Sequence, residues 1–191
     1  MWTKGIFLTS IMGLHARSIT TPNILIGVLM FFGGVCQVIA GVIEFLSGNI
    51  FGATLFPSYA AFNFSYAMIY LPGTGIMAAY TDPKIGAIRD EFDQALAIFL
   101  LAWFILTVIL SIGAVRSSWV LFLDLVSLSV CLLLLACGNM VGSSALLTAR
   151  YSFGLVVAFL TYWAGSAGLG AGNTTPINIP TFEMYKGDQV V

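Results

Sequence analysis

The stretch EFLSGNIFGATLFPSYAAF, residues 44–62, joins two long apolar runs and turns the chain from one to the other. Gly48 and Asn49 are turn-forming residues at the junction. Pro57 lies deep in the second run, with two hydroxyl-bearing residues directly after it. A proline removes one backbone donor and weakens the helical turn that precedes it. The stretch therefore predicts a helical hairpin whose second helix is kinked and carries polar groups within its apolar length.

The 191 residues of the chain are 59% hydrophobic and only 8% charged, with a mean hydropathy of +1.00. Soluble domains carry about 25% charged residues, so this chain has too few charges to cover a surface that faces water. We therefore expect an integral membrane protein embedded in the lipid bilayer. The net charge of -1 and the scattered Lys and Arg residues argue against nucleic acid as a partner.

Five apolar runs are long enough to cross a bilayer, which takes about 20 mostly apolar residues. A sixth run, at the N-terminal end, has only about half that length. The runs predict an all-α polytopic membrane helix bundle on a six-span plan with the first span incomplete. The membrane domain covers residues 1–168 with spans at 5–16 (partial), 24–46, 50–71, 94–115, 118–137 and 143–168, and an extended tail covers 169–191.

A short internal similarity links the two halves of the chain. GNIFGATLF (48–56) resembles GNMVGSSAL (138–146), and each segment follows one apolar run and opens the next. Asn49 and Asn139 occupy the same place in the two segments, and both are candidates either to line a path or to have a structural role. The similarity is either a chance match or the trace of a duplicated three-helix unit. A unit with an odd number of spans, duplicated in tandem, must be inverted in the membrane, as it is in many transporters.

Polar and ionisable residues within the spans are the candidates for function, because a charge inside the bilayer is costly and usually has a role. Asp124 lies deep in SWVLFLDLVSLSV, whereas Glu44 lies one turn before the hairpin turn and either lines a path or reaches the headgroups. Arg150 either pairs with a carboxylate or extends to the interface. Ser58 and Tyr59 either form the wall of a path for a small polar solute or belong to a packed, kinked helix.

Three glycines, Gly27, Gly34 and Gly41, recur every seven residues and so share one face of the 24–46 helix. Small residues let neighbouring membrane helices approach closely, and we expect this face to pack against another helix. The chain has no nucleophile elbow, phosphate loop or zinc-ligand spacing, and it has a single His. We therefore expect no enzyme activity, no metal and no cofactor.

Four segments together resemble the acetate uptake transporter family, and in particular its fungal branch. The resemblance covers residues 6–170 and implies a six-helix protomer that assembles as a homo-hexamer in the plasma membrane. It also implies a path within each protomer for acetate and other small monocarboxylates, generally moved with protons. The four segments are TTPNILIGVLMFFGG (20–34), AGVIEFLSGNIFGATLFPSYAAF (40–62), IYLPGTGI (69–76) and LLACGNMVG (134–142).

The resemblance further implies that a Phe, a Tyr and a Leu narrow this path. The Tyr corresponds to Tyr59 by the Ser-Tyr step, and the Leu corresponds to Leu128 by its spacing to the later Gly-Asn pair. The Phe belongs to the first helix, after an Asn-Pro-Ala-Pro-Leu-Gly signature that is not present here, and Phe7 is its candidate. The expected function is transport of small monocarboxylates, acetate first. The alternatives are ammonia or ammonium transport, and a transport-inactive paralogue that acts as an interaction or sensing subunit.

Overall fold

The computed structural model describes residues 3–14, 23–170 and 179–184, and within these ranges the chain is helical apart from turns, short loops and two isolated bridges. The helix α1 (Thr3–Gly13) is followed by one continuous rod that consists of α2 (Leu25–Gly27), the π-helical η2 (Val28–Val35) and α3 (Cys36–Leu46). The expected all-α fold is confirmed. The remaining helices are α4 (Ile50–Tyr70), α5 (Ile76–Ala79), α6 (Asp90–Ala114), α7 (Trp119–Val141) and α8 (Ser144–Gly170).

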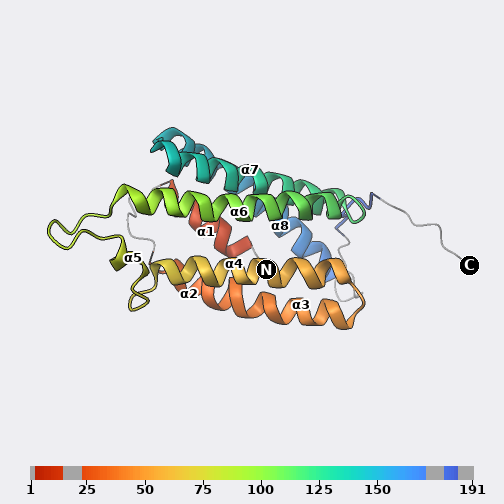
Figure 1. The fold of residues 1–191 in the computed structure, drawn as a ribbon. Coiled ribbons are helices and arrows are strands. Elements are labelled where there is room, and N and C mark those ends of the chain that lie inside the picture. Colours follow the sequence, from red (N-terminus) through yellow and green to blue (C-terminus); the bar gives the residue numbers. More distant parts are fainter. Residues whose placement is uncertain (1–2, 15–22, 171–178, 185–191) are drawn as a thin grey trace, which may run out of the picture.

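The long helices run side by side as two hairpins with two further helices packed on them. Figure 1 shows α3 beside α4 and α6 beside α7, while α8 packs on α7 and α1 packs on α8. The α3–α4 turn and the α6–α7 turn lie at one end of the bundle, and the α7–α8 turn lies at the other end (Figure 1). The two similar segments, 48–56 and 138–146, therefore reverse the chain at opposite ends, which is the placement that an inverted duplication requires.

The described residues contain four helices that are long and apolar enough to cross a membrane. The helix α4 has 21 residues, which is also enough for a crossing. It is not one of the four, and it contains Pro57, three tyrosines and the polar residues Thr54, Ser58, Asn63 and Ser65. The helix α1, with 11 residues, covers about half a bilayer. The four helices are Leu25–Leu46, Asp90–Ala114, Trp119–Val141 and Ser144–Gly168.

Large apolar side chains point outward from the long helices rather than only into the core. They include Ile39, Ile43, Ile98, Ile109 and Phe159, each more than half exposed. Such a surface is stable against lipid tails and costly against water. The chain is an integral, multi-pass membrane protein.

The hairpin turn fixes where α4 begins. Gly48 has a φ of +79°, in the left-handed region that glycine adopts without a steric penalty. Asn49 caps α4, because its Oδ1 accepts a hydrogen bond from the N–H of Gly52 at 3.1 Å. Its Nδ2 donates to the Glu44 carboxylate at 2.6 Å. The side chains at this turn thus hold the start of α4 against the end of α3.

The predicted glycine face packs on α4 at two of its three positions. A Cβ atom at Gly34 would lie 2.4 Å from the Phe64 ring, and one at Gly41 would lie 2.5 Å from Cγ of Pro57. A Cβ atom at Gly27 would meet nothing within 4 Å. The prolyl ring inside α4 is therefore accommodated by the absence of a side chain at Gly41.

Replacing Gly41 with alanine is expected to destabilise the protein by about 1–3 kcal/mol, the usual cost of overpacking a filled interior. Gly27→Ala is the matched control, and it should be neutral or stabilising because alanine favours the helix by about 0.5–1 kcal/mol. The measurement is the unfolding midpoint of the detergent-purified protein. Equal midpoints for the two variants would contradict close packing between α3 and α4.

Candidate functional site

Two cavities lie within the bundle, one toward each end. The first has a volume of about 110 Å³ and is lined by side chains of α1, η2, α3, α4, α6, α7 and α8. Its lining includes Tyr66 and Arg150, which are near the α7–α8 end. The second has a volume of about 470 Å³ and reaches the opposite end, where Asn49 and Arg116 belong to the two turns. A single water needs only about 10–15 Å³, so both cavities can hold a small solute.

Leu128 lines both cavities, and no other residue in the described part of the chain does so. It lies near the middle of α7 and is 8% exposed. Tyr59, which is 2% exposed, lines the first cavity from α4. The two residues expected to narrow a path are therefore placed at, or next to, the point where the two cavities approach each other.

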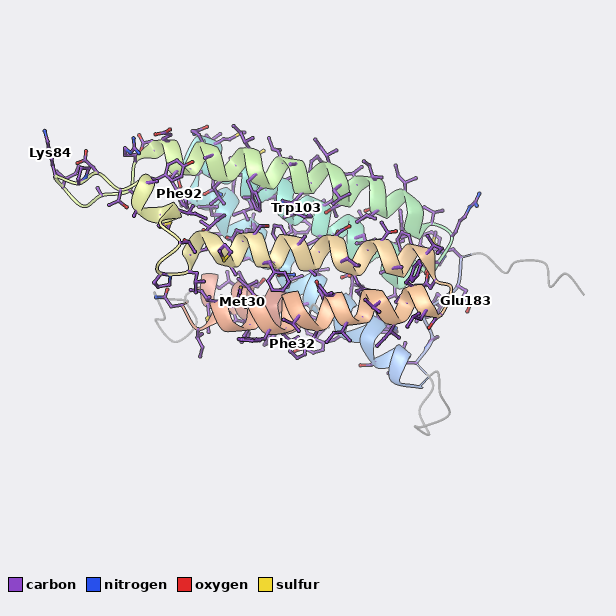
Figure 2. All side chains as sticks on the ribbon, turned by 60° about the horizontal axis from the view of Figure 1, so that its bottom comes forward. Met30, Phe32, Lys84, Phe92, Trp103 and Glu183 are labelled. Carbon is purple, nitrogen blue, oxygen red and sulfur yellow. The ribbon has the colours of Figure 1, made fainter. Side chains whose placement is uncertain are left out.

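The Tyr59 hydroxyl ties α4 to α6. It lies 3.0 Å from Oγ1 of Thr107, and that hydroxyl in turn donates to the carbonyl of Trp103 at 2.8 Å. Because the hydrogen of Thr107 goes to Trp103, Tyr59 is the donor toward Thr107. Trp103 also lines the first cavity, and Figure 2 shows it on α6, whereas Phe32 lies on the other side of α4 in that view.

A pair of amides forms the polar wall between η2, α3 and α4. The Asn63 Nδ2 group donates to the carbonyl of Tyr59 at 2.8 Å, and it lies 3.2 Å from the carbonyl of Gly33 and 3.3 Å from Oε1 of Gln37. Gln37 is fully buried and lines the first cavity. Its Nε2 group has no hydrogen-bond partner among the residues that the structure describes, and leaving a buried donor unpaired costs about 1–3 kcal/mol. Such a donor favours a ligand that brings an acceptor.

The second cavity contains ionisable groups of both signs. Asp124 on α7 is 9% exposed and lines it together with Glu44 and Arg116. The Thr161 hydroxyl on α8 lies 2.9 Å from Oδ1 of Asp124 and 2.7 Å from the carbonyl of Val157. A hydroxyl has one hydrogen to donate. With an ionised Asp124, Thr161 must share its one hydrogen between the two acceptors. Two separate, full hydrogen bonds form at once only when Asp124 is protonated and donates to Thr161.

Three of the residues proposed from the sequence lie outside both cavities. The Ser58 hydroxyl donates to the carbonyl of Thr54 at 2.7 Å, within its own helix. Asn139 likewise donates to the carbonyl of Leu135 at 2.7 Å. Phe7 packs edge-on against Tyr162, with 6.2 Å between the ring centroids. Glu44, Asn49, Asp124, Tyr59 and Leu128 do line a cavity.

The candidate residues named from the sequence do not include Gln37, Asn63 or Thr161. A signal for the first two was present, since each is the only amide within its apolar span. Thr161 carries no such signal, because a lone threonine in a membrane helix commonly bonds to its own backbone. Its importance comes from its contact with Asp124, which depends on how α7 and α8 pack.

Comparison with known proteins identifies the fold and the family of this chain. A solved structure, described as the structure of the bacterial acetate channel SatP, superimposes with a TM-score of 0.78 at 24% identity, covering 94% of this chain and 93% of that one. This likeness establishes a shared fold. The sequence profile of the GPR1/FUN34/yaaH family matches residues 2–186.

Curated relatives come from fungi and bacteria. Ammonia transport outward protein 2 of Saccharomyces cerevisiae is 33% identical over 96% of this chain and 64% of its own length. Acetate permease A of Emericella nidulans is 33% identical over 91% and 60%, respectively. The succinate-acetate/proton symporter SatP of Escherichia coli K12 is 31% identical over 70% and 66%. The chain thus spans less than two thirds of the length of these relatives. It belongs to the GPR1/FUN34/yaaH family.

Proposed function

We propose that this protein transports small monocarboxylates, acetate first, across the plasma membrane together with protons. The observation that carries the proposal is the pair of cavities that reach toward opposite ends of the bundle and share Leu128. A transporter needs solute access from both sides and a barrier between them. Here the barrier is one apolar side chain with Tyr59 next to it, which suits a solute with a small apolar part.

Proton coupling follows from the cost of charge at this barrier. An isolated carboxylate moved into an apolar environment loses its hydration at great cost, whereas the neutral acid does not. A small acid therefore crosses Leu128 most readily in its protonated form. Asp124, in the second cavity, is a group that can hold such a proton, because its contact with Thr161 is completed by the protonated carboxyl. The relative named as a succinate-acetate/proton symporter supports the same coupling.

Ammonia or ammonium transport is the second candidate, because a relative is named an ammonia transport outward protein. The first cavity argues against the ammonium ion as its occupant. No Asp or Glu is among its described lining residues, whereas Arg150 is. A buried cation repels ammonium strongly where the effective dielectric constant is low. Ammonia flux in proteoliposomes tests this candidate, and acetate uptake without any ammonia flux would reject it.

Saturable uptake of labelled acetate is the expected result when the protein is expressed in cells that lack other permeases. Cells with an empty vector measure the diffusion of the neutral acid through lipid, and the difference between the two is the activity of the protein. Surface expression must be verified in the same cells. If the protein is at the surface and no saturable component remains, transport is rejected and the interaction or sensing subunit becomes the better explanation.

The homo-hexamer belongs to this proposal as well. The outward apolar side chains of α3, α6 and α8 supply surface that either lipid or a second protomer can cover. Light scattering of the detergent-purified protein measures the number of protomers. A monomer in mild detergent would remove the hexamer from the proposal and leave transport within one protomer untouched.

A further inference from the structure

Arg150 lines the first cavity and has no balancing carboxylate among the residues that the structure describes. The residue is 8% exposed and lies on α8. An arginine side chain stays protonated in proteins, so its burial has a large cost unless a partner offsets it. Within the described residues, no carboxylate lies at ion-pair distance from it. Its guanidinium carbon lies 4.2 Å from the centre of the Tyr151 ring, which offsets only part of that cost.

We propose that Arg150 and Gln37 form a binding site in the first cavity for the carboxylate group of a small acid in its ionised form. Both residues line this cavity, one bringing a positive charge and the other an N–H donor that finds no partner among the described residues. A carboxylate accepts two parallel hydrogen bonds from a guanidinium and has further lone pairs for an amide donor. This inference rests on the proposed function and names the chemical form in which the substrate binds.

The rest of the lining favours a carboxylate over a simple inorganic anion. Phe32, Trp103 and Leu132 contribute apolar surface to the same cavity. Chloride would gain nothing from this surface, whereas the methyl group of acetate is removed from water there. The volume of about 110 Å³ suits an acid of few carbons. The site therefore combines a charged end with a short apolar chamber.

The two cavities then have complementary roles. The first holds one cation and, among its described lining residues, no carboxylate, whereas the second holds Glu44, Asp124 and one arginine. An acid bound as its anion at Arg150 must gain a proton before it passes Leu128, because an unpaired charge is too costly at that barrier. The site that binds the anion is thus separated in space from Leu128, which the acid passes in its neutral form.

Binding of labelled acetate to the purified full chain, with competition by acetamide, tests the site. Acetamide has the shape of acetate and no charge. We expect the wild-type protein to prefer acetate, and Arg150→Gln to weaken acetate binding at least about tenfold while acetamide binding is unchanged. A tenfold loss corresponds to about 1.4 kcal/mol, which is modest for a charge-assisted pair. Arg150→Lys should recover part of the loss because it keeps the charge without the planar fork.

Lys84→Gln is the matched control, since it removes one positive charge from the exposed loop between α5 and α6. Figure 2 shows Lys84 at the tip of that loop, away from the helices. This variant should bind acetate as the wild type does. The thermal midpoint of each variant is measured alongside, so that a folding defect is recognised.

Three outcomes would overturn the site. In the first, Arg150→Gln binds acetate with the same affinity as the wild type. In the second, the affinities of Arg150→Gln for acetate and for acetamide fall to the same extent, which indicates a structural role. In the third, chloride competes as well as acetate does, which indicates a general anion site. Loss of acetate binding in Arg150→Gln together with no uptake by the wild-type protein would reject transport and retain the site. If Arg150→Gln takes up labelled acetate as the wild type does, the site is rejected and transport is retained.

Discussion

Leu128→Trp is expected to reduce protein-dependent acetate uptake to the level of cells with an empty vector. Leu128 lies between the two cavities, and the described lining of the two cavities shares no other residue. An indole at this position adds bulk at the residue that both cavities share, and Tyr59 lines the first of these cavities with it. Uptake of labelled acetate over a range of concentrations should show the loss in the maximal rate, because the binding groups of the first cavity are unchanged.

Leu123→Trp is the matched control, because Leu123 lies on the same helix and is 44% exposed on its outer surface. It should transport at close to the wild-type rate. Leu128→Ala provides the opposite change, since a wider constriction should raise the uptake of propionate and butyrate relative to acetate. This substitution also costs about 2–5 kcal/mol of stability. The comparison therefore uses the uptake rates of propionate and butyrate divided by that of acetate, and not the absolute rates. An unchanged ratio, or full activity in Leu128→Trp, would contradict a barrier at this residue.

The helices and the hairpin could be predicted from the sequence because the bilayer imposes a length on each apolar run. The turn at Gly48 and Asn49 was predictable from local chemistry, because both residue types favour turns. Tyr59 and Leu128 came from family resemblance, and the structure places both on the cavities. That these two residues narrow a path stays a prediction.

Neighbouring positions show why the rest was not predictable. Ser58 and Tyr59 are consecutive, and consecutive residues on a helix point in different directions. Only Tyr59 therefore lines a cavity, whereas Ser58 bonds to its own helix. Asn139 matches Asn49 in sequence, but its turn comes later, at Gly142 with a φ of +64°. Asn139 consequently stays inside α7, whereas Asn49 caps α4.

Contacts between helices were the least predictable part of the site. Asn63 reaches the carbonyl of Gly33 within the π-helical η2, where the helical turn is wider than in an α-helix. The hydropathy pattern contains no signal for that local change. The same holds for Asp124 and Thr161, which are 37 residues apart in sequence and meet only because α7 packs on α8.

Asp124→Asn is expected to lower protein-dependent acetate uptake in acidic medium and to weaken its dependence on pH, because the variant cannot hold the proton. In the wild-type protein the Thr161 hydroxyl has two acceptors within hydrogen-bond distance, and only a protonated Asp124 completes both contacts. Raising the pH removes that proton, so the competent fraction should fall by about tenfold for each pH unit once the group titrates. An asparagine donates to Thr161 at every pH. The uptake rate of Asp124→Asn, corrected for empty-vector cells, should therefore be lower than the wild-type rate in mildly acidic medium and should change less than the wild-type rate does when the medium is made mildly basic.

The other ionisable groups around the second cavity provide the comparison. Glu44 on α3 and Arg116 in the α6–α7 turn line the same cavity, and Tyr59 on α4 lies on the far side of Leu128. Glu44 already accepts a hydrogen bond from Asn49 at 2.6 Å, so Glu44→Gln should keep the steep pH profile of the wild type. Asp124→Glu should keep a pH dependence with a shifted midpoint, because it retains a carboxyl group. If Asp124→Asn keeps the wild-type profile while Glu44→Gln loses it, the proton is held at the mouth of the cavity. The conclusion would then be that Asp124 serves only to join α7 to α8.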